Sequence, residues 1–411
     1  MRADSDGKLM QPVCAESLYL HPKQFFLKST TIKFSIYLAC FGIGLFAATV
    51  KGQENKDNPV RVNDPKTIFE TPAVYELMHI AFALTDTGKY SGSLNIYYNV
   101  VDTSTTYYKQ VISHFSAHKN HPLIIHLNKH LDKSLMHYLY NLQKAYNSRL
   151  DGNTIKRDFY FPFFQRLLHS SKSVSRNLME AFAQESDFKS FYQNHRSAYQ
   201  QTLEDAKGKL NMPAIESWLS AEFPADYDTF RIVISPLMNA THFTKRFRFK
   251  GNKTSIMWVK DGLGYNPALY SQTQIAGLYT GVVFTEIDHN YVNKVSDTYK
   301  KKISRIMGEN NRPKWIRMDG DGKYYSNGYK IFNEYMTHAA FLVYTGTIYA
   351  KGDQLVLEHS RIKLMEERRG YLRFEEFYKQ LSHFYQTRKE GETITHLYPK
   401  MLDWCSRQNG E

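Results

Sequence analysis

The stretch Thr285-Glu-Ile-Asp-His289 decides how this chain is interpreted, together with the apolar run Ile275–Phe284 that precedes it. On a helix, residues four apart share one face. The stretch differs only at its first position from H-E-x-x-H, in which two histidines hold one zinc ion and the glutamate activates the bound water. Threonine stands where the first histidine would be, so one imidazole is missing.

The residues around this stretch predict a mostly helical α+β fold. Apolar residues recur at three- and four-residue spacing through most of 71–224, which indicates helices. Thr229–Pro236 and Thr254–Val259 are rich in β-branched and aromatic residues and predict two strands. Helical spacing returns over Ile331–Tyr344 and Ile362–Tyr385. A short sheet should therefore precede the motif helix, and a helical part should follow it.

These patterns divide the chain into five predicted segments. They are a targeting segment (1–52), an exposed polar leader (53–70), a mainly helical region (71–224), the strand and motif-helix region (225–345) and a C-terminal helical region (346–411).

The beginning of the chain has the pattern of a secretory signal. Lys28 and Lys33 precede the apolar run Phe34–Val50, and small residues end at Gly52, so cleavage there would expose Gln53. We therefore expect an exported protein, located in the periplasm, at the cell surface or outside the cell. The run is slightly short for a bilayer span, so any membrane contact should come through this segment alone.

Cysteine content and charge limit the classes of protein further. Cys14 and Cys40 lie in the segment expected to be removed, which leaves Cys405 alone and allows no internal disulfide. Bacterial export fits this better than a disulfide-rich scaffold does. The net charge of +13 comes from scattered basic residues without a nucleic-acid motif, so we expect no nucleic-acid partner.

A second helix follows the motif helix and carries Asn333-Glu334. This order resembles the gluzincin branch of zinc metallopeptidases, in which the third metal ligand is a glutamate, often preceded by asparagine, on the helix after H-E-x-x-H. The resemblance implies a zincin-like centre. Three segments also resemble a family of secreted bacterial proteins with a peptidase-like domain of unknown function, over about Pro72 to Trp404. They are Ser235–His242, Glu286–Asn293 and Phe332–Tyr335.

The resemblance implies that His289 and Glu334 are zinc ligands and that Glu286 is the general base. Thr285 departs from the pattern, and a tetrahedral catalytic zinc needs three protein donors. The missing donor would come from His242, Asp288 or His338. Tyr291, His242 or His338 would stabilise the oxyanion.

The expected function is that of an exported zinc metallopeptidase-like protein, weakened or inactive, acting on a peptide or protein. Because Thr285 replaces a ligand, we expect zinc to be substoichiometric or absent, and Thr285→His to raise its occupancy. The alternative is a peptide- or glycan-binding protein of the bacterial envelope that keeps the frame without the metal.

Other interpretations of the same residues stay open. Glu286 and His289 can simply pair across one helical turn. A second E-x-x-H at Glu76–His79 would suit a di-iron carboxylate bundle, although export and the strands argue against it. Paired-carboxylate glycosidase chemistry also remains possible from sequence. A last candidate is a histidine cluster formed by His126, His130 and His137.

Overall fold

The structure is a computed structural model, and it places most of the chain after the predicted targeting segment. Residues 1–52 lie outside the described part, and so does the signal prediction. Within the described part, no helix combines the length and apolar character needed to cross a bilayer. The residues described are 59–86, 100–131, 135–157, 174–239, 241–249, 251–262, 264–320, 322, 325 and 327–410.

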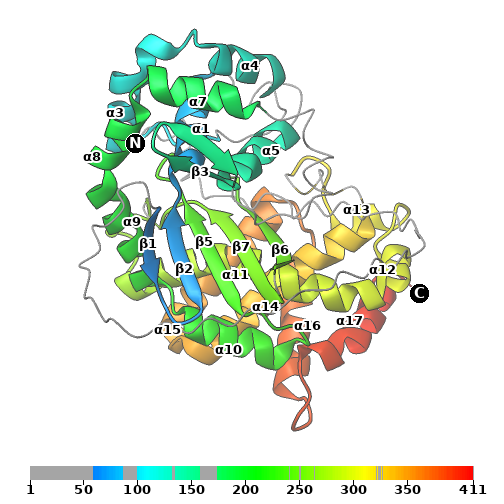
Figure 1. Cartoon of the computed structure of the whole chain (residues 1–411). Coiled ribbons are helices and arrows are strands. Elements are labelled where there is room, and N and C mark those ends of the chain that lie inside the picture. Colours follow the sequence, from blue (N-terminus) through cyan, green and yellow to red (C-terminus); the bar gives the residue numbers. More distant parts are fainter. Residues whose placement is uncertain are drawn as a thin grey trace, which may run out of the picture.

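A five-stranded sheet forms the centre of the molecule (Figure 1). Its order is β1-β2-β5-β7-β6, with β2, β5 and β7 parallel and the two outer strands antiparallel to their neighbours. The strands are β1 (Val60–Asn63), β2 (Thr67–Thr71), β5 (Thr229–Ile234), β6 (Phe243–Phe249) and β7 (Asn252–Val259). The two predicted strands correspond to β5 and β7, and the mostly helical α+β class is confirmed.

The predicted exposed leader 53–70 is wrong for its second half. Residues 60–63 and 67–71 form β1 and β2, and Phe69 and Glu70 are buried. In β1, Val60 and Val62 are buried, and Arg61 and Asn63 are exposed. Polar residues at alternate positions belong to the exposed face of an edge strand, and this lowered the hydrophobic signal of the segment.

The region 71–224 is mainly helical, as predicted, with one short hairpin. In Figure 1 its first helices gather beyond one end of the sheet. The elements are α1 (Ala73–Leu84), α3 (Thr106–Phe115), the 3-10 turn η2 (Ser116–His118), α4 (Pro122–Leu131), α5 (Leu135–Tyr146), the hairpin β3 (Ser148–Asp151) and β4 (Thr154–Arg157), α7 (Arg176–Glu185), α8 (Phe188–Asn194), α9 (Arg196–Lys209) and α10 (Met212–Glu222).

The long helix α11 (Gln272–Thr298) carries the motif stretch and is buried along most of its length. Ser271 and Gln274 form a capping box that fixes its first turn. Asn290 donates hydrogen bonds to the hydroxyls of Thr244 and Ser255, so α11 covers the sheet face on which these side chains lie. The opposite face carries Trp258, whose ring meets Tyr146 edge-on at 5.2 Å between centroids.

The helix α14 (Gly328–Ile348) packs against α11 and is almost as buried. Asn327 caps it by accepting a hydrogen bond from the backbone N–H of Lys330. Helices around this pair complete the C-terminal part (Figure 1). They are α12 (Lys300–Ile306), α13 (Arg312–Trp315), α15 (Lys351–Lys363), the π-helical turn η4 (Leu364–Arg368), α16 (Phe374–Gln386) and α17 (Ile394–Gln408).

Candidate functional site: a buried cluster of histidine, glutamate and arginine

Three of the sequence-predicted site residues meet between α11 and α14. The Nε2 atom of His289 lies 3.3 Å from Oε1 of Glu334, and Nε2 of His338 lies 3.6 Å from Oε2 of Glu334. Glu334 and His338 are four residues apart on α14, so they share a helix face. All three side chains are buried, with at most 3% exposed.

Two arginines that the sequence analysis did not single out complete this cluster. Arg369 follows the turn η4 and donates through Nη2 to Oε2 of Glu334 at 2.6 Å and to the hydroxyl of Tyr325 at 2.6 Å. Its Nη1 lies 2.5 Å from Nε2 of His338. Arg361, on α15, approaches the other ring nitrogen of His338 at 2.9 Å. We call Glu334, His289, His338, Arg361 and Arg369 the closed cluster.

Glycines make room for both arginines. A Cβ atom on Gly281 of α11 would collide with the guanidinium of Arg361. A Cβ on Gly320 or Gly322 would collide with the backbone of Arg369, and the N–H of Gly322 donates to the Arg369 carbonyl at 2.7 Å. The closed cluster therefore depends on close backbone approach at positions far apart in the sequence.

The charges of the closed cluster follow from its burial and contacts. Burial raises the pKa of Glu334, but the positive charge of Arg369 and the contacts with His289 and His338 outweigh this and hold it well below its usual value. Burial lowers the pKa of His289 and of His338, and Arg369 adds to both effects. Two charged guanidiniums thus face one carboxylate and two neutral imidazoles.

A neutral imidazole has only one acceptor nitrogen. Since Arg361 and Arg369 are both donors, only one of their contacts with His338 is a full hydrogen bond. The arginine of the other contact approaches a ring N–H, which is an unfavourable arrangement inside a protein.

The residues of the closed cluster do not fit a zinc ion in this arrangement. Arg369 points its N–H groups at Oε2 of Glu334 and Nε2 of His338, whose lone pairs a metal would need. A divalent cation would also lie beside a buried guanidinium charge. Within the described residues, no group of three or more His, Cys, Asp or Glu side chains is arranged to hold a metal.

Thr285 also takes no part in such a donor set. Its hydroxyl donates to the backbone carbonyls of Gly281 and Val282, at 2.8 and 3.2 Å, as is common for threonine inside a helix. Glu286 is fully buried on the same helix.

The remaining predicted site residues have other neighbours. His242 is buried at the start of β6, where burial and the charge of Lys260 lower its pKa to about 3. Asp288 is buried near Tyr398 of α17. Burial raises the pKa of Tyr398, and the charge of Asp288 raises it further. Tyr291 packs edge-on against Tyr227, at 5.3 Å between ring centroids. The expectation that His242, Asp288 or Tyr291 would join the site therefore finds no support in their positions.

The second E-x-x-H motif lies in a separate environment. Glu76 on α1 accepts a hydrogen bond from the hydroxyl of Tyr107 at 2.8 Å, and His79 packs edge-on against Tyr75 and Tyr138, at 4.7 and 6.1 Å. These neighbours come from α1, α3 and α5, whereas His289 meets α14. No di-iron arrangement joins the two motifs in the described residues.

The three histidines of α4 and α5 do come together. The ring centroids of His126 and His130 are 4.6 Å apart, and those of His130 and His137 are 5.6 Å apart. Burial and the neighbouring His130 and His137 lower the pKa of His126. The rings of His130 and His137 stack, those of His126 and His130 are tilted, and no metal-holding arrangement is found among the described residues.

Compared with models of protein families, with curated proteins and with solved structures, the chain matches none of them. The resemblance to gluzincins therefore stays a prediction.

Proposed function

We propose that this is an exported, non-catalytic binding protein on a zincin-like frame, in which Arg369 takes the place that zinc has in the peptidases it resembles. The observation that carries this is the position of Arg369, in contact with Glu334 and His338 at once. A guanidinium cannot activate water as a metal does, because it is always protonated and offers no Lewis acidity.

The proposed partner is a peptide or protein segment. β6 forms one edge of the sheet and pairs only with β7 among the described strands. An edge strand can accept a further strand from a partner through its unpaired backbone groups. Lys245, Arg246 and Arg248 lie on β6, which favours a partner with acidic side chains.

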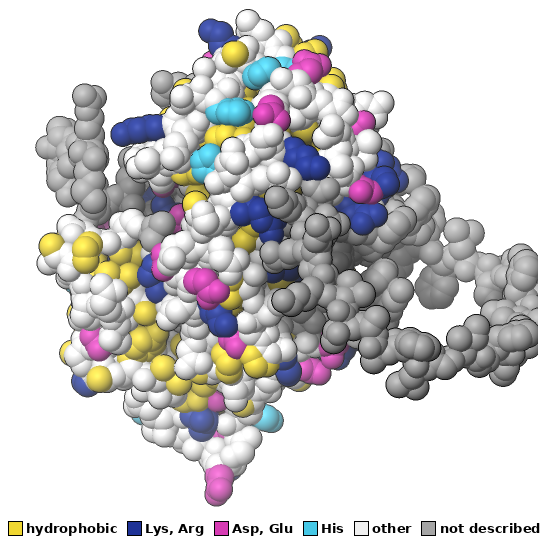
Figure 2. Space-filling model, turned by 60° about the vertical axis from the view of Figure 1, so that its left-hand side comes forward, with side chains coloured by type: hydrophobic (Ala, Val, Ile, Leu, Met, Phe, Trp, Pro, Cys, Tyr) yellow, Lys and Arg dark blue, Asp and Glu magenta, His cyan; other side chains and the backbone are white. Residues whose placement is uncertain are grey.

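The distribution of charged side chains on the surface favours a peptide or protein partner over nucleic acid. On the face shown in Figure 2, basic side chains are interspersed with acidic ones instead of gathering in one area. A nucleic-acid site usually concentrates Lys and Arg on one face.

An active zinc peptidase is the second candidate, and one distance favours it. Two ligands of one tetrahedral zinc, each bound at about 2.0–2.1 Å, lie roughly 3.3 Å apart. The atoms Nε2 of His289 and Oε1 of Glu334 have this separation. For this function Arg369 would have to leave the closed cluster and a third donor would have to replace it.

Zinc analysis of the purified protein separates the two candidates. The wild type, Glu334→Gln and a variant lacking two half-buried histidines (His126→Ala with His130→Ala) are equilibrated with zinc, and bound metal is measured by elemental analysis. The histidine variant is a control because the ring cluster on α4 and α5 is the other place where zinc could collect.

We expect the wild type and Glu334→Gln to bind the same amount of zinc. We also expect no peptidase activity in the wild type that is lost in Glu286→Gln. One zinc per chain that survives in the histidine variant and disappears in Glu334→Gln would refute it in favour of the peptidase.

The peptide part of the proposal has its own test. Fluorescently labelled acidic peptides are titrated with the wild type and with Arg248→Glu, which reverses one exposed charge on β6. We expect binding that weakens in the variant. Equal binding by both forms, or none, would exclude β6 as the docking edge.

A further inference from the structure

A second buried glutamate, Glu70, lies on the sheet face opposite α11. Arg231 donates to both of its carboxylate oxygens at 2.8 and 2.9 Å, and Arg61 donates to Oε2 at 2.9 Å. The hydroxyl of Tyr146 adds a fourth hydrogen bond, at 2.8 Å. We call Glu70, Arg61, Arg231 and Tyr146 the open cluster, because one of its members reaches the surface.

The carboxylate of Glu70 is charged and fully occupied. Burial raises its pKa, but the charges and hydrogen bonds of Arg231 and Arg61 outweigh burial, so the net pKa lies below its usual value. Its single negative charge balances one of these two guanidiniums. The open cluster therefore keeps an excess positive charge, and the side chain of Arg61 is 39% exposed.

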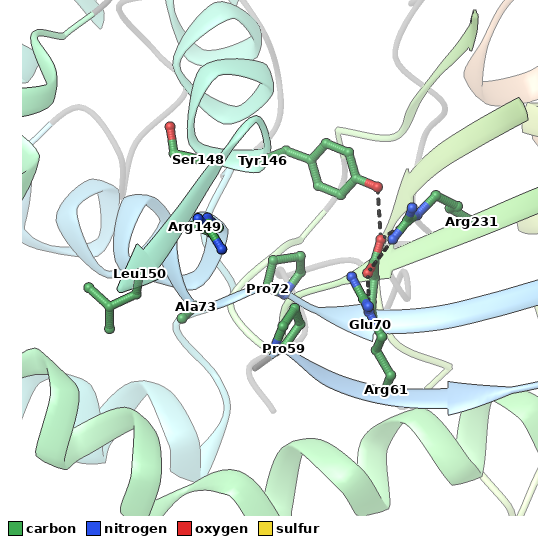
Figure 3. Close-up of a pocket in the computed structure, with 10 residues that line it drawn as sticks. All are labelled: Pro59, Arg61, Glu70, Pro72, Ala73, Tyr146, Ser148, Arg149, Leu150 and Arg231. Carbon is green, nitrogen blue, oxygen red and sulfur yellow. Dashed lines mark hydrogen bonds and ion pairs between the residues drawn. The ribbon is translucent and has the colours of Figure 1, made fainter. Parts of the chain in front are cut away.

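A pocket of about 30 Å³ adjoins this cluster. Arg149 of β3 lines it as well, and Figure 3 shows its guanidinium directed toward the start of α1 and away from Glu70. Arg149 makes no hydrogen bond or ion pair with another described residue. The nearby acidic residue Asp151 is paired with Lys156 at 2.5 Å.

The surroundings of the pocket add to this positive charge. Burial lowers the pKa of Lys144, and the charges of Arg157 and Arg176 lower it further, which indicates a basic environment behind β3. The start of α1 also lines the pocket at Pro72 and Ala73, and Pro72 offers no side-chain cap to the first-turn N–H groups. The partial positive charge of a helix start favours anions.

The geometry points to this pocket as a binding site for a carboxylate group, either of a small organic acid or of a peptide chain end, bound by Arg149 beside the start of α1. A site for one water needs at least about 10–15 Å³ of such volume, so the pocket has room for roughly two oxygen-sized groups. This matches the two oxygens of a carboxylate better than the four of a phosphate. Planar guanidiniums pair well with carboxylates.

This site is independent of the proposed function, because the sheet separates it from the closed cluster. Its chemistry is binding only, and no bond is made or broken there.

Calorimetric titration of the purified protein with acetate, at constant ionic strength, tests the site. Acetate should bind, and acetamide, which has the same shape without the charge, should not. Arg149→Gln should raise the acetate Kd by at least about tenfold, since a charge-assisted hydrogen bond contributes about 1.5–3 kcal/mol. Because Arg149 is exposed, this variant should fold normally, which circular dichroism verifies.

Lys119→Gln is the matched control, because it removes the same charge from an exposed position outside the pocket. It should change the acetate Kd by less than about threefold, as expected for a screened surface charge. Absence of acetate binding, or equal weakening by both variants, would overturn the proposal. Tighter binding of inorganic phosphate than of acetate would overturn the assignment to a carboxylate.

A second pair of ligands separates the two sources of the carboxylate. N-acetylglycine and its amide are titrated beside acetate. Tighter binding of N-acetylglycine than of acetate, with no binding of the amide, identifies a chain end, whereas equal binding of the two acids identifies a small organic acid.

Discussion

The closed and open clusters use the same chemistry in two different settings. In each, a buried glutamate is held by arginine, and its pKa lies below the usual value. In the closed cluster the arginine bound to Glu334, Arg369, is only 1% exposed. In the open cluster, by contrast, Arg61 reaches solvent and a pocket remains beside it.

We therefore assign a structural role to the closed cluster and a binding role to the open cluster. In the closed cluster the guanidinium of Arg369 already contacts Glu334 and His338, so a further cation would have to displace it. In the open cluster the carboxylate is already satisfied, and the remaining positive charge borders an accessible space. Accessibility of the excess charge, more than the presence of arginine and glutamate, therefore decides where a ligand can bind.

The largest expected effect comes from Glu334→Gln. Removing this charge leaves Arg369 buried without its counterion, and breaking a buried pair in this way costs about 3–5 kcal/mol. Urea unfolding of the variant and the wild type measures the loss. Glu70→Gln is the comparison. It also removes the counterion of a buried arginine, Arg231, but it should cost somewhat less because Arg61 can turn to solvent. An equal or larger loss in Glu70→Gln would break the distinction between the clusters.

Stability should fall steeply in mild acid. Four fully buried histidines have pKa values below the usual one: His79, His242, His289 and His338. The unfolded chain takes up protons that the folded chain does not, so stability falls as the pH drops below about 6.5. Glu76, whose pKa burial raises to about 7, acts in the opposite direction between about pH 4.5 and 7, and Asp288, whose pKa burial also raises, acts in the same sense as Glu76.

These six groups together give a net uptake of about two protons on unfolding, or about 3 kcal/mol per pH unit near pH 5–6. Urea unfolding at several pH values measures this slope. Glu76→Gln removes an opposing group and should make the fall steeper. Glu70→Gln should leave this slope nearly unchanged, because the pKa of Glu70 is lowered in the folded chain and its carboxylate is charged in both states near pH 5–6. A slope that depends on Glu70 would contradict this.

Gly281→Ala tests the packing of the closed cluster. The added methyl group would displace the guanidinium of Arg361, and overpacking of this kind costs about 1–3 kcal/mol. Gly208 on α9 is the matched control, because a Cβ there meets nothing within 4 Å. Gly208→Ala should stabilise the protein by up to about 1 kcal/mol, as alanine is the better helix former. If both variants changed the free energy of unfolding in the same direction, the room for Arg361 would be unimportant.

The smallest expected effect is that of Arg61→Gln. Its side chain is 39% exposed and Arg231 still neutralises Glu70, so the free energy of unfolding should change by less than about 1 kcal/mol. Thermal unfolding measures it. A larger loss would show that the open cluster depends on its exposed arginine as the closed cluster depends on its buried one.

Local patterns in the sequence predicted the mainly helical regions and two of the strands. β-branched and aromatic residues predicted β5 and β7, and helical periodicity predicted the helices, because both signals come from neighbouring residues on one face. The four-residue spacing of Glu334 and His338 likewise placed them on one side of α14. The strands β1, β2 and β6 and the hairpin of β3 and β4 were not predicted. In β1 the exposed positions are polar, which hides the strand signal.

Only the tertiary structure decided what surrounds Glu334. Arg369 lies 35 residues further along the chain, and nothing in the sequence around it distinguishes it from the other scattered basic residues. Its burial depends on the turn η4 and on the close approach of Gly320 and Gly322, which no local pattern reveals. A motif fixes which side chains share a helix face. The groups that meet them from other segments depend on how those segments pack, and here that packing places an arginine against the donors that zinc would need.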